Sequence, residues 1–75
     1  MVLIALRITV DPQVRFGKPV IEGTRVPVSV IVGAIAAGDS WEEIGQEYRI
    51  SEEDIRAALA YAANRLEEET VRAPI

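Results

Sequence analysis

Two serines, at positions 40 and 51, fix the starts of two consecutive helices. Ser40 is followed three residues later by Glu43, and Ser51 is followed at the same spacing by Asp54. With this spacing, the serine hydroxyl and the acidic side chain can each accept a hydrogen bond from the other residue's backbone amide. Both pairs are therefore typical of a capping box at a helix N-terminus. The sequence predicts helices over residues 41–48 and 52–66.

Each of these segments carries an apolar stripe that one side of a helix would bury. The apolar side chains at helical spacing are Trp41, Ile44 and Tyr48 in the first segment, and Ile55, Ala58, Leu59, Ala62 and Leu66 in the second. Two short helices joined by a tight turn, the second longer than the first, form the outline of a helix-turn-helix. The fold class we expect is mainly α with a small β element, built on a trihelical, helix-turn-helix-like core.

Three residues around the turn between these helices have predicted roles. Gly45 is small where the helix over 41–48 must pass close to the helix over 52–66, and Ile50 can fill the core from the turn. Arg49 stands where such turns usually carry glycine, so a left-handed backbone there would cost on the order of 1 kcal/mol.

A third helix is expected over residues 28–37, with Ser29 as a possible cap and Gly38 as its C-terminal stop. The run 26–38 around it contains no charged residue. A helix that is apolar on all sides needs cover on more than one face. That cover can come from the rest of this chain, from a second copy or from another protein, and we expect a homodimer or higher homo-oligomer.

The N-terminal part is expected to be extended. Residues 2–10 alternate in a period of two and predict one strand, with Leu6, Ile8 and Val10 on one face. Asp11-Pro12 ends it because proline has no amide hydrogen for the ladder. Residues 20–28 predict a short hairpin whose turn lies over 22–25.

The composition excludes several classes of protein. The chain has 75 residues with no cysteine, no histidine and a single lysine. Disulfides and the common zinc sites are therefore excluded, and we expect no cofactor, no metal and no catalytic activity. No segment approaches the roughly 20 apolar residues that cross a bilayer, so a cytoplasmic protein without membrane contact is expected. Residues 1–66 should form one domain and residues 67–75 a flexible tail.

Charge is divided unequally along the chain, whose net charge is −4. Residues 1–38 carry four basic and two acidic residues, whereas residues 39–75 carry four basic and ten acidic ones. The basic residues of the first part are Arg7, Arg15, Lys18 and Arg25. They are candidates for phosphate contacts that hold DNA without reading its sequence, unless they form an ordinary solvated surface.

The start of the helix over 52–66 argues against direct reading of DNA bases. DNA-binding proteins of this type place that end against base edges. Here it carries Glu52, Glu53 and Asp54, which suit the helix dipole but repel phosphates. Arg56 is the single cation in its first turns and a further candidate DNA contact. Because these acids disfavour DNA, a stand-alone helix-turn-helix DNA-binding regulator is the alternative function rather than the leading one.

Residues 17–28, GKPVIEGTRVPV, resemble the signature of the domain-of-unknown-function 433 family. The likeness runs from about Ile8 to Ala63 and includes Gly38, Ser40, Glu43, Ile44, Tyr48, Glu53, Asp54, Ile55 and the stretch 58–62. The resemblance implies a winged-helix-like or trihelical fold. It also implies, for many members, the role of a VapB-like antitoxin beside a nuclease-like toxin of the PIN type.

Such a toxin would hold divalent metal with clustered carboxylates, which a cationic side chain can neutralise or block. Lys18, Thr24 and Arg25 are the candidate partner-binding residues, because a turn can push one side chain into a cleft and arginine pairs with carboxylates through two hydrogen bonds. Alternatively, Thr24 and Arg25 hold their own hairpin. The function we expect is an antitoxin-like protein that inhibits a nuclease-like toxin and regulates its own operon.

Overall fold

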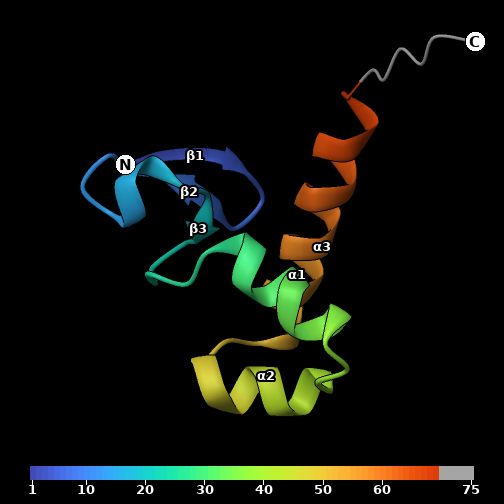
Figure 1. Cartoon of the computed structure of the whole chain (residues 1–75). Coiled ribbons are helices and arrows are strands. Elements are labelled where there is room, and N and C mark those ends of the chain that lie inside the picture. The colour runs from blue at the N-terminus through green and yellow to red at the C-terminus, as the bar shows by residue number, and fades with distance from the viewer. Residues whose placement is uncertain (70–75) are drawn as a thin grey trace, which may run out of the picture.

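The computed structural model describes residues 1–69 and contains a three-stranded antiparallel sheet followed by three helices (Figure 1). The strands are β1 (Val2–Ala5), β2 (Ile8–Val10) and β3 (Val20–Ile21), and a 3-10 turn, η1 (Arg15–Gly17), precedes β3. The helices are α1 (Val28–Ala36), α2 (Trp41–Tyr48) and α3 (Glu52–Glu67). The expected fold class is therefore confirmed.

The prediction of one strand over residues 2–10 is wrong, because the chain folds back on itself at Leu6 and Arg7. β1 pairs antiparallel with β2, and β2 pairs antiparallel with β3. Leu6 does not share a buried face with Ile8; it lies in the turn and is 79% exposed. Arg7 takes a left-handed backbone with a φ of 62°. A period of two cannot separate one long strand from two short strands, and no glycine marks the turn.

The chain also turns back after β3, as expected for the segment 20–28. The Ile21 amide donates to the Val26 carbonyl over 3.0 Å, and Val20 forms an isolated bridge with Pro27. The Val28 amide donates to the carbonyl of Pro19 over 3.0 Å. These bonds place the first turn of α1 directly beside the strand segment.

α1 begins at Val28 as predicted and ends at Ala36, one residue before its predicted end, but its predicted cap is wrong. Gly38 stops the helix with a φ of 98°, and the amides of Gly38 and Asp39 donate to the carbonyls of Ile35 and Ala34. This pair of bonds is a Schellman motif, which favours glycine. Ser29 is not the N-cap, because Pro27 occupies that position. Pro27 makes no side-chain hydrogen bond there. Proline suits this place since its ring already fixes the φ angle.

Both predicted capping boxes are present. The Ser40 hydroxyl accepts from the Glu43 amide over 3.1 Å, and the Glu43 carboxylate accepts from the Ser40 amide over 2.9 Å. Ser51 and Asp54 form the same pair over 3.1 and 3.0 Å. Arg49 is left-handed with a φ of 56°, as its position in the turn predicts.

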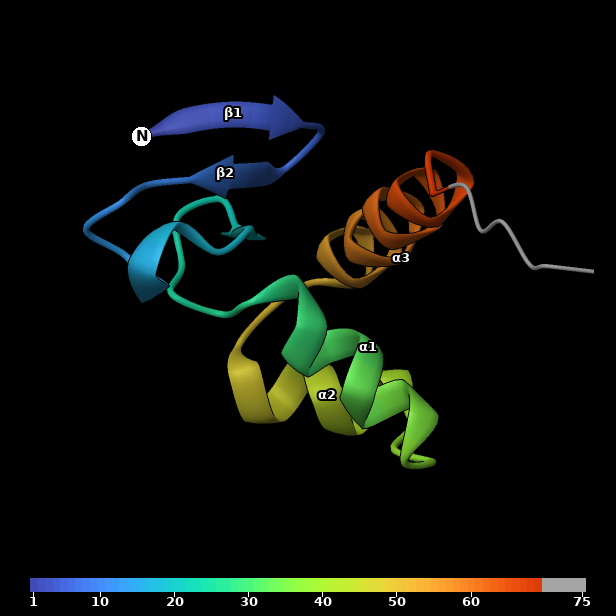
Figure 2. The same cartoon turned by 45° about the horizontal axis from the view of Figure 1, so that its top comes forward.

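The core lies where the sheet meets the helices. Figures 1 and 2 show the sheet above α1 and α2, with α3 beside both. One isoleucine from each of five elements is fully buried: Ile8, Ile21, Ile31, Ile44 and Ile55. Ile50 fills the core from the turn as expected, and is 8% exposed. Ala57 and Ala58 are also buried, so their small side chains let α3 approach the rest of the core.

This chain itself covers much of α1. Val28 and Ile31 are buried, and Val32, Ala34 and Ile35 are packed against the core. α3 extends one residue beyond its predicted end, and the greater part of the predicted tail, residues 70–75, lies outside the described residues. Within residues 1–69, no helix is both long and apolar enough to cross a membrane.

Gly45 does mark a close approach, but its neighbour is the turn rather than α3. A Cβ at this position would lie 3.1 Å from the carbonyl oxygen of Ile50. A Cβ at Gly33 in α1 would meet no atom within 4 Å. The two helical glycines therefore differ in the space around them.

We expect Gly33→Ala to raise the free energy of unfolding by about 0.5–1 kcal/mol, because alanine loses less backbone entropy in a helix. Gly45→Ala should bring no such gain, since its Cβ crowds the Ile50 carbonyl. Urea denaturation of the two variants and the wild type measures both values. Equal stabilisation by the two alanines would show that the close approach at Gly45 is not a constraint.

Candidate functional site

Three basic side chains gather at one end of the sheet. Arg15 begins η1 and Lys18 directly follows it. η1 lies on the side of the sheet away from α3 (Figures 1 and 2), and Arg25 ends the turn after β3. The Arg15 Nε donates to the Arg25 carbonyl over 3.2 Å and so joins the two segments. All three residues are exposed. We call Arg15, Lys18 and Arg25 the basic tip.

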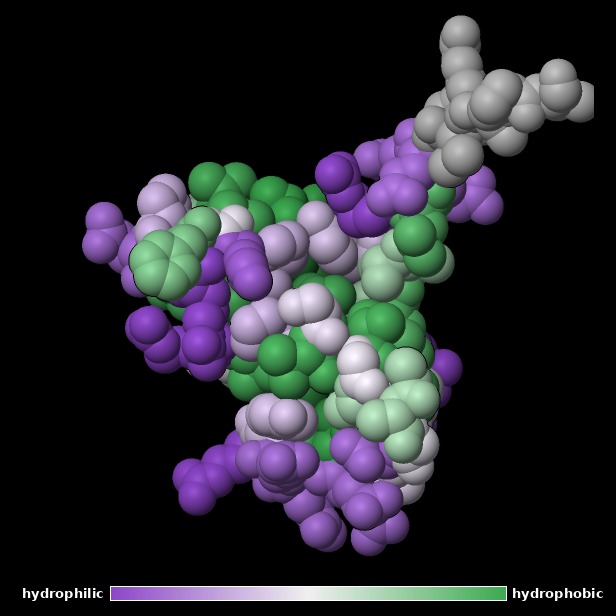
Figure 3. Space-filling model, viewed as in Figure 1, coloured by the Kyte–Doolittle hydropathy of each residue, from purple (hydrophilic) through white to green (hydrophobic). Residues whose placement is uncertain are grey.

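The cations of the basic tip have no acidic partner in the described part of the chain. The ion pairs within residues 1–69 are formed by Arg7, Arg56 and Arg65. The space-filling view shows hydrophilic residues gathered on the η1 side of the sheet, below a hydrophobic area over β1 (Figure 3). The three cations are therefore exposed without an ion pair within residues 1–69, although the Arg15 Nε also joins two segments of the fold.

Thr24 holds the turn that presents Arg25. Its hydroxyl donates to the Ile21 carbonyl over 2.8 Å and accepts from the Val26 amide over 3.0 Å. Both bonds stay within the hairpin, which is the alternative that the sequence left open for this residue. Thr24 therefore positions the Arg25 backbone.

The structure separates Arg7 and Arg56 from the basic tip. The Arg7 guanidinium pairs with Asp54 over 3.0 Å. Arg56 pairs with Glu52 over 3.2 Å and lies over the Trp41 ring, 5.3 Å from its centroid. Both side chains thus contact the start of α2 or α3. Of the five candidate nucleic-acid contacts, these two are engaged within the protein.

Two of the acids at the helix starts, Asp54 and Glu43, serve as caps. Burial alone would raise the pKa of Asp54, but hydrogen bonds from the Ser51 backbone and the Arg7 guanidinium together hold that pKa below its ordinary value. The Ser40 backbone amide, and then its hydroxyl, lower the pKa of Glu43. Capping accounts for these carboxylates, and no group of three metal-binding side chains occurs among residues 1–69.

Sequence reasoning missed Phe16, which lies inside the loop that carries the basic tip. Its side chain is 98% exposed. Arg15, Phe16 and Gly17 have successive φ angles of 51°, 57° and 80°. The available signal was an aromatic residue between Arg15 and Gly17, in a loop without apolar periodicity.

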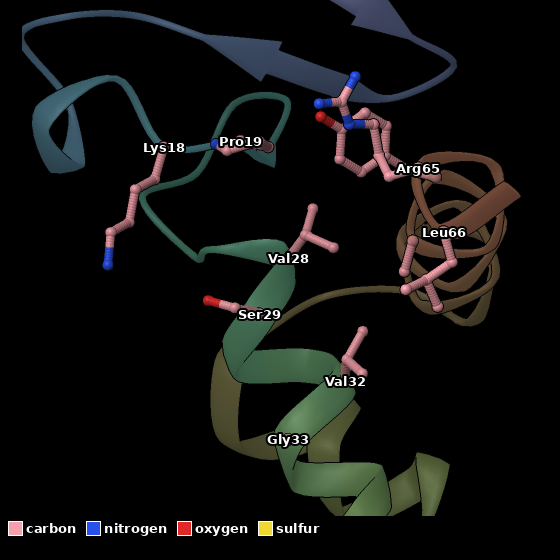
Figure 4. Close-up of a pocket in the computed structure, with 10 residues that line it drawn as sticks. Lys18, Pro19, Val28, Ser29, Val32, Gly33, Arg65 and Leu66 are labelled. Carbon is pink, nitrogen blue, oxygen red and sulfur yellow. The ribbon is translucent and has the colours of Figure 1, made fainter. Parts of the chain in front are cut away.

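An apolar groove of about 630 Å³ adjoins Lys18, between the start of α1 and the end of α3. Val28 and Val32 of α1 point toward Leu66 of α3 across it (Figure 4). The Lys18 ammonium points away from α3, so only the stem of this side chain lines the groove (Figure 4). The basic tip and the groove are neighbours but present different chemistry.

A family model described as "Protein of unknown function (DUF433)" matches residues 8–62. Uncharacterized protein y4eO of Sinorhizobium fredii is 39% identical over 56 residues, which are 73% of this chain and 25% of that protein. A Mycobacterium tuberculosis protein named "Putative antitoxin VapB45" is 29% identical over 52 residues, which are 69% of this chain and 22% of that protein.

Among solved structures, the crystal structure of Rv2018 from Mycobacterium tuberculosis superposes with a TM-score of 0.64 and 29% identity. The superposition covers 69% of this chain and 24% of that chain. The present chain therefore spans about a quarter of the length of the relatives it matches. β1 lies outside the residues that the family model matches.

Asp54→Ala is expected to lower the free energy of unfolding by about 1 kcal/mol, because it removes a cap and the partner of Arg7. Glu53→Ala, at an exposed neighbouring position, is the control. A lowered pKa stabilises the fold above the ordinary value of 3.8, and this contribution is lost as the pH falls through the folded-state pKa. The difference in the free energy of unfolding between wild type and Asp54→Ala, measured by urea denaturation, should therefore be constant near neutral pH. It should become smaller below pH 3.8. If the difference in the free energy of unfolding is just as large in strong acid, the charge of the Asp54 carboxylate is not its source.

Proposed function

The chain belongs to the DUF433 family, and from this premise we propose that it is an antitoxin-like protein that binds and inhibits a nuclease-like toxin of the PIN type. The observation that carries the proposal is the basic tip, three exposed cations without acidic partners among residues 1–69. A relative of similar sequence bears the name putative antitoxin. The protein acts by binding and has no chemistry of its own.

Arg25 is the side chain that enters the toxin's acidic cleft. Its backbone is held by the Thr24 hydrogen bonds and by the contact of its carbonyl with Arg15. The fixed backbone leaves only the side chain to be ordered when the planar guanidinium pairs with a carboxylate. Lys18, whose amide donates to the Arg15 carbonyl, adds a second positive charge to the basic tip. Positive charge is in excess in residues 1–38 and negative charge in residues 39–75, and this asymmetry orients the basic tip toward an acidic partner.

Regulation of its own operon is the second part of the proposal. The first turn of α3 is acidic, and the two arginines on that side, Arg7 and Arg56, are already paired. Contacts to operator phosphates therefore fall to Arg15, Lys18 and Arg25. Toxin and DNA then compete for the same tip, and toxin binding releases the operator.

The proposal includes a homodimer, formed by pairing β1 of one copy with β1 of the other. β1 is an edge strand, and its large apolar side chains are widely exposed: Val2 61%, Leu3 57% and Ile4 43%. An edge strand without charge or proline is a ready template for another strand. The outer face of α1 is the weaker candidate, because most of its exposed residues are small: Ser29, Gly33 and Ala36.

Co-expression with the product of the adjacent gene, tested as the nuclease-like toxin, tests the central claim. The tagged wild-type chain should recover this protein. Arg25→Ala should weaken the measured affinity about 30-fold or more, because loss of one partner from a buried charge pair costs at least about 2 kcal/mol. Arg65→Ala removes a cation that already pairs with Glu68 and is the matched control.

Either of two results would contradict the proposal. Failure of the wild-type chain to recover the nuclease-like protein, or to relieve its toxicity, removes the antitoxin function. Equal weakening by Arg25→Ala and Arg65→Ala removes the basic tip as its binding surface.

Leu3→Lys is expected to convert the dimer into a monomer, because it places a charge on both copies of the paired strand. Ala36→Lys, on the exposed face of α1, should leave the dimer intact. Light scattering at micromolar concentration measures the mass of each. A monomeric wild type would refute the dimer, and a dimer broken only by Ala36→Lys would move the interface to α1.

A further inference from the structure

Phe16 is unlike every other aromatic residue of this protein. Trp41, Tyr48 and Tyr61 are packed against the core, whereas the Phe16 ring is 98% exposed. Leaving such a ring in water forgoes the burial that stabilises the other three. Nothing in the fold therefore explains why an aromatic residue occupies this position.

The backbone that carries this ring is strained. Arg15 and Phe16 have φ angles of 51° and 57°, a region that is unfavourable for residues with a side chain. Gly17 follows with a φ of 80°, which glycine adopts without steric strain. A glycine at position 16 would relieve the strain, yet the chain places its only phenylalanine there.

Hydrogen bonds hold the loop in this conformation. The Gly17 amide donates to the Val14 carbonyl and the Lys18 amide to the Arg15 carbonyl, both over 3.1 Å. The Arg15 Nε bond to the Arg25 carbonyl ties the loop to the next turn. Strained residues persist where surrounding contacts fix them, and they gather at binding sites. The backbone that presents the ring is thus held in a set conformation before any partner arrives.

We propose that Phe16 is the hydrophobic anchor of the toxin interface, entering an apolar pocket whose acidic rim pairs with the basic tip. The inference rests on the proposed function, since the partner is the same acidic nuclease-like protein. Tight interfaces place an aromatic side chain in a pocket and surround it with polar contacts that exclude water. Arg15 and Lys18 flank Phe16 in sequence and Arg25 is joined to the same loop, so the cations are placed for that rim.

A protein partner suits this surface better than single-stranded nucleic acid. Proteins that bind single strands stack successive bases on several aromatic side chains within a basic groove. Here the other three aromatic residues are packed against the core, so Phe16 could stack one base at most.

Phe16→Gly tests the anchor because its two expected effects have opposite signs. Relief of the left-handed strain should move the urea midpoint of the free protein upward. Loss of the ring should weaken binding to the co-purified nuclease-like protein about 30-fold or more, as for other aromatic anchors. A phenylalanine with a purely structural role would instead lose stability when replaced.

Three further variants complete the experiment. Phe16→Ala removes the ring but keeps the strain, so it should weaken binding without stabilising the protein. Phe16→Tyr should keep the affinity within a few fold, because the ring remains. Val30→Ala, which trims an exposed apolar residue on α1, should change nothing.

The outcomes separate this inference from the proposed function. If the wild-type chain recovers the nuclease-like protein and Phe16→Gly binds it as tightly, the anchor is wrong and the basic tip alone remains. If the wild type recovers nothing, the antitoxin function fails and the anchor with it. If Phe16→Gly loses binding only to a labelled oligothymidine, the surface serves nucleic acid and the protein anchor is refuted.

Discussion

The contact between Arg7 and Asp54 joins the sheet to the helices at the edge of the isoleucine core. One oxygen of Asp54 accepts from the Arg7 guanidinium and the other accepts from the Ser51 amide at the start of α3. The Arg7 carbonyl in turn accepts from the Glu22 amide after β3. A single carboxylate thus joins the β1–β2 turn to α3, and the isoleucine core fills the space between. The basic tip depends on this placement because it is carried on the far side of the same small sheet.

The parts that were predictable from sequence are those decided by neighbours along the chain. Capping at Ser40 and Ser51 and termination at Gly38 need only residues within three or four positions. The β1–β2 turn could not be predicted, because Arg7 adopts its left-handed backbone with support from a residue 47 positions away. The candidate cations were found from sequence, but their division into paired and unpaired groups required the tertiary structure. The exposure of Phe16 was not predicted, because an exposed aromatic side chain in a loop leaves no periodic pattern in the sequence.

Two exposed surfaces of different character lie on this small domain. The basic tip belongs to the part that the DUF433 model matches, whereas the apolar edge of β1 precedes it. The proposed toxin contact is therefore built from family residues, and the proposed self-association from residues outside that match. This chain spans about a quarter of the length of its longer relatives. A surface that contacts a separate molecule in this protein could, in those relatives, contact another part of the same polypeptide. Separate surfaces would let one molecule hold a second copy and a toxin together.

The two kinds of contact that build this protein also differ in when they can form. Each capping box closes over three residues, while the Arg7–Asp54 pair closes over 47. Contacts between distant residues form more slowly than local ones, because a longer stretch of chain must first be brought together. The helices are therefore expected to fold early and the sheet to dock last. The bonds within the basic tip are local as well, so the tip can take its shape early, and only its position relative to the helices is set at the final step.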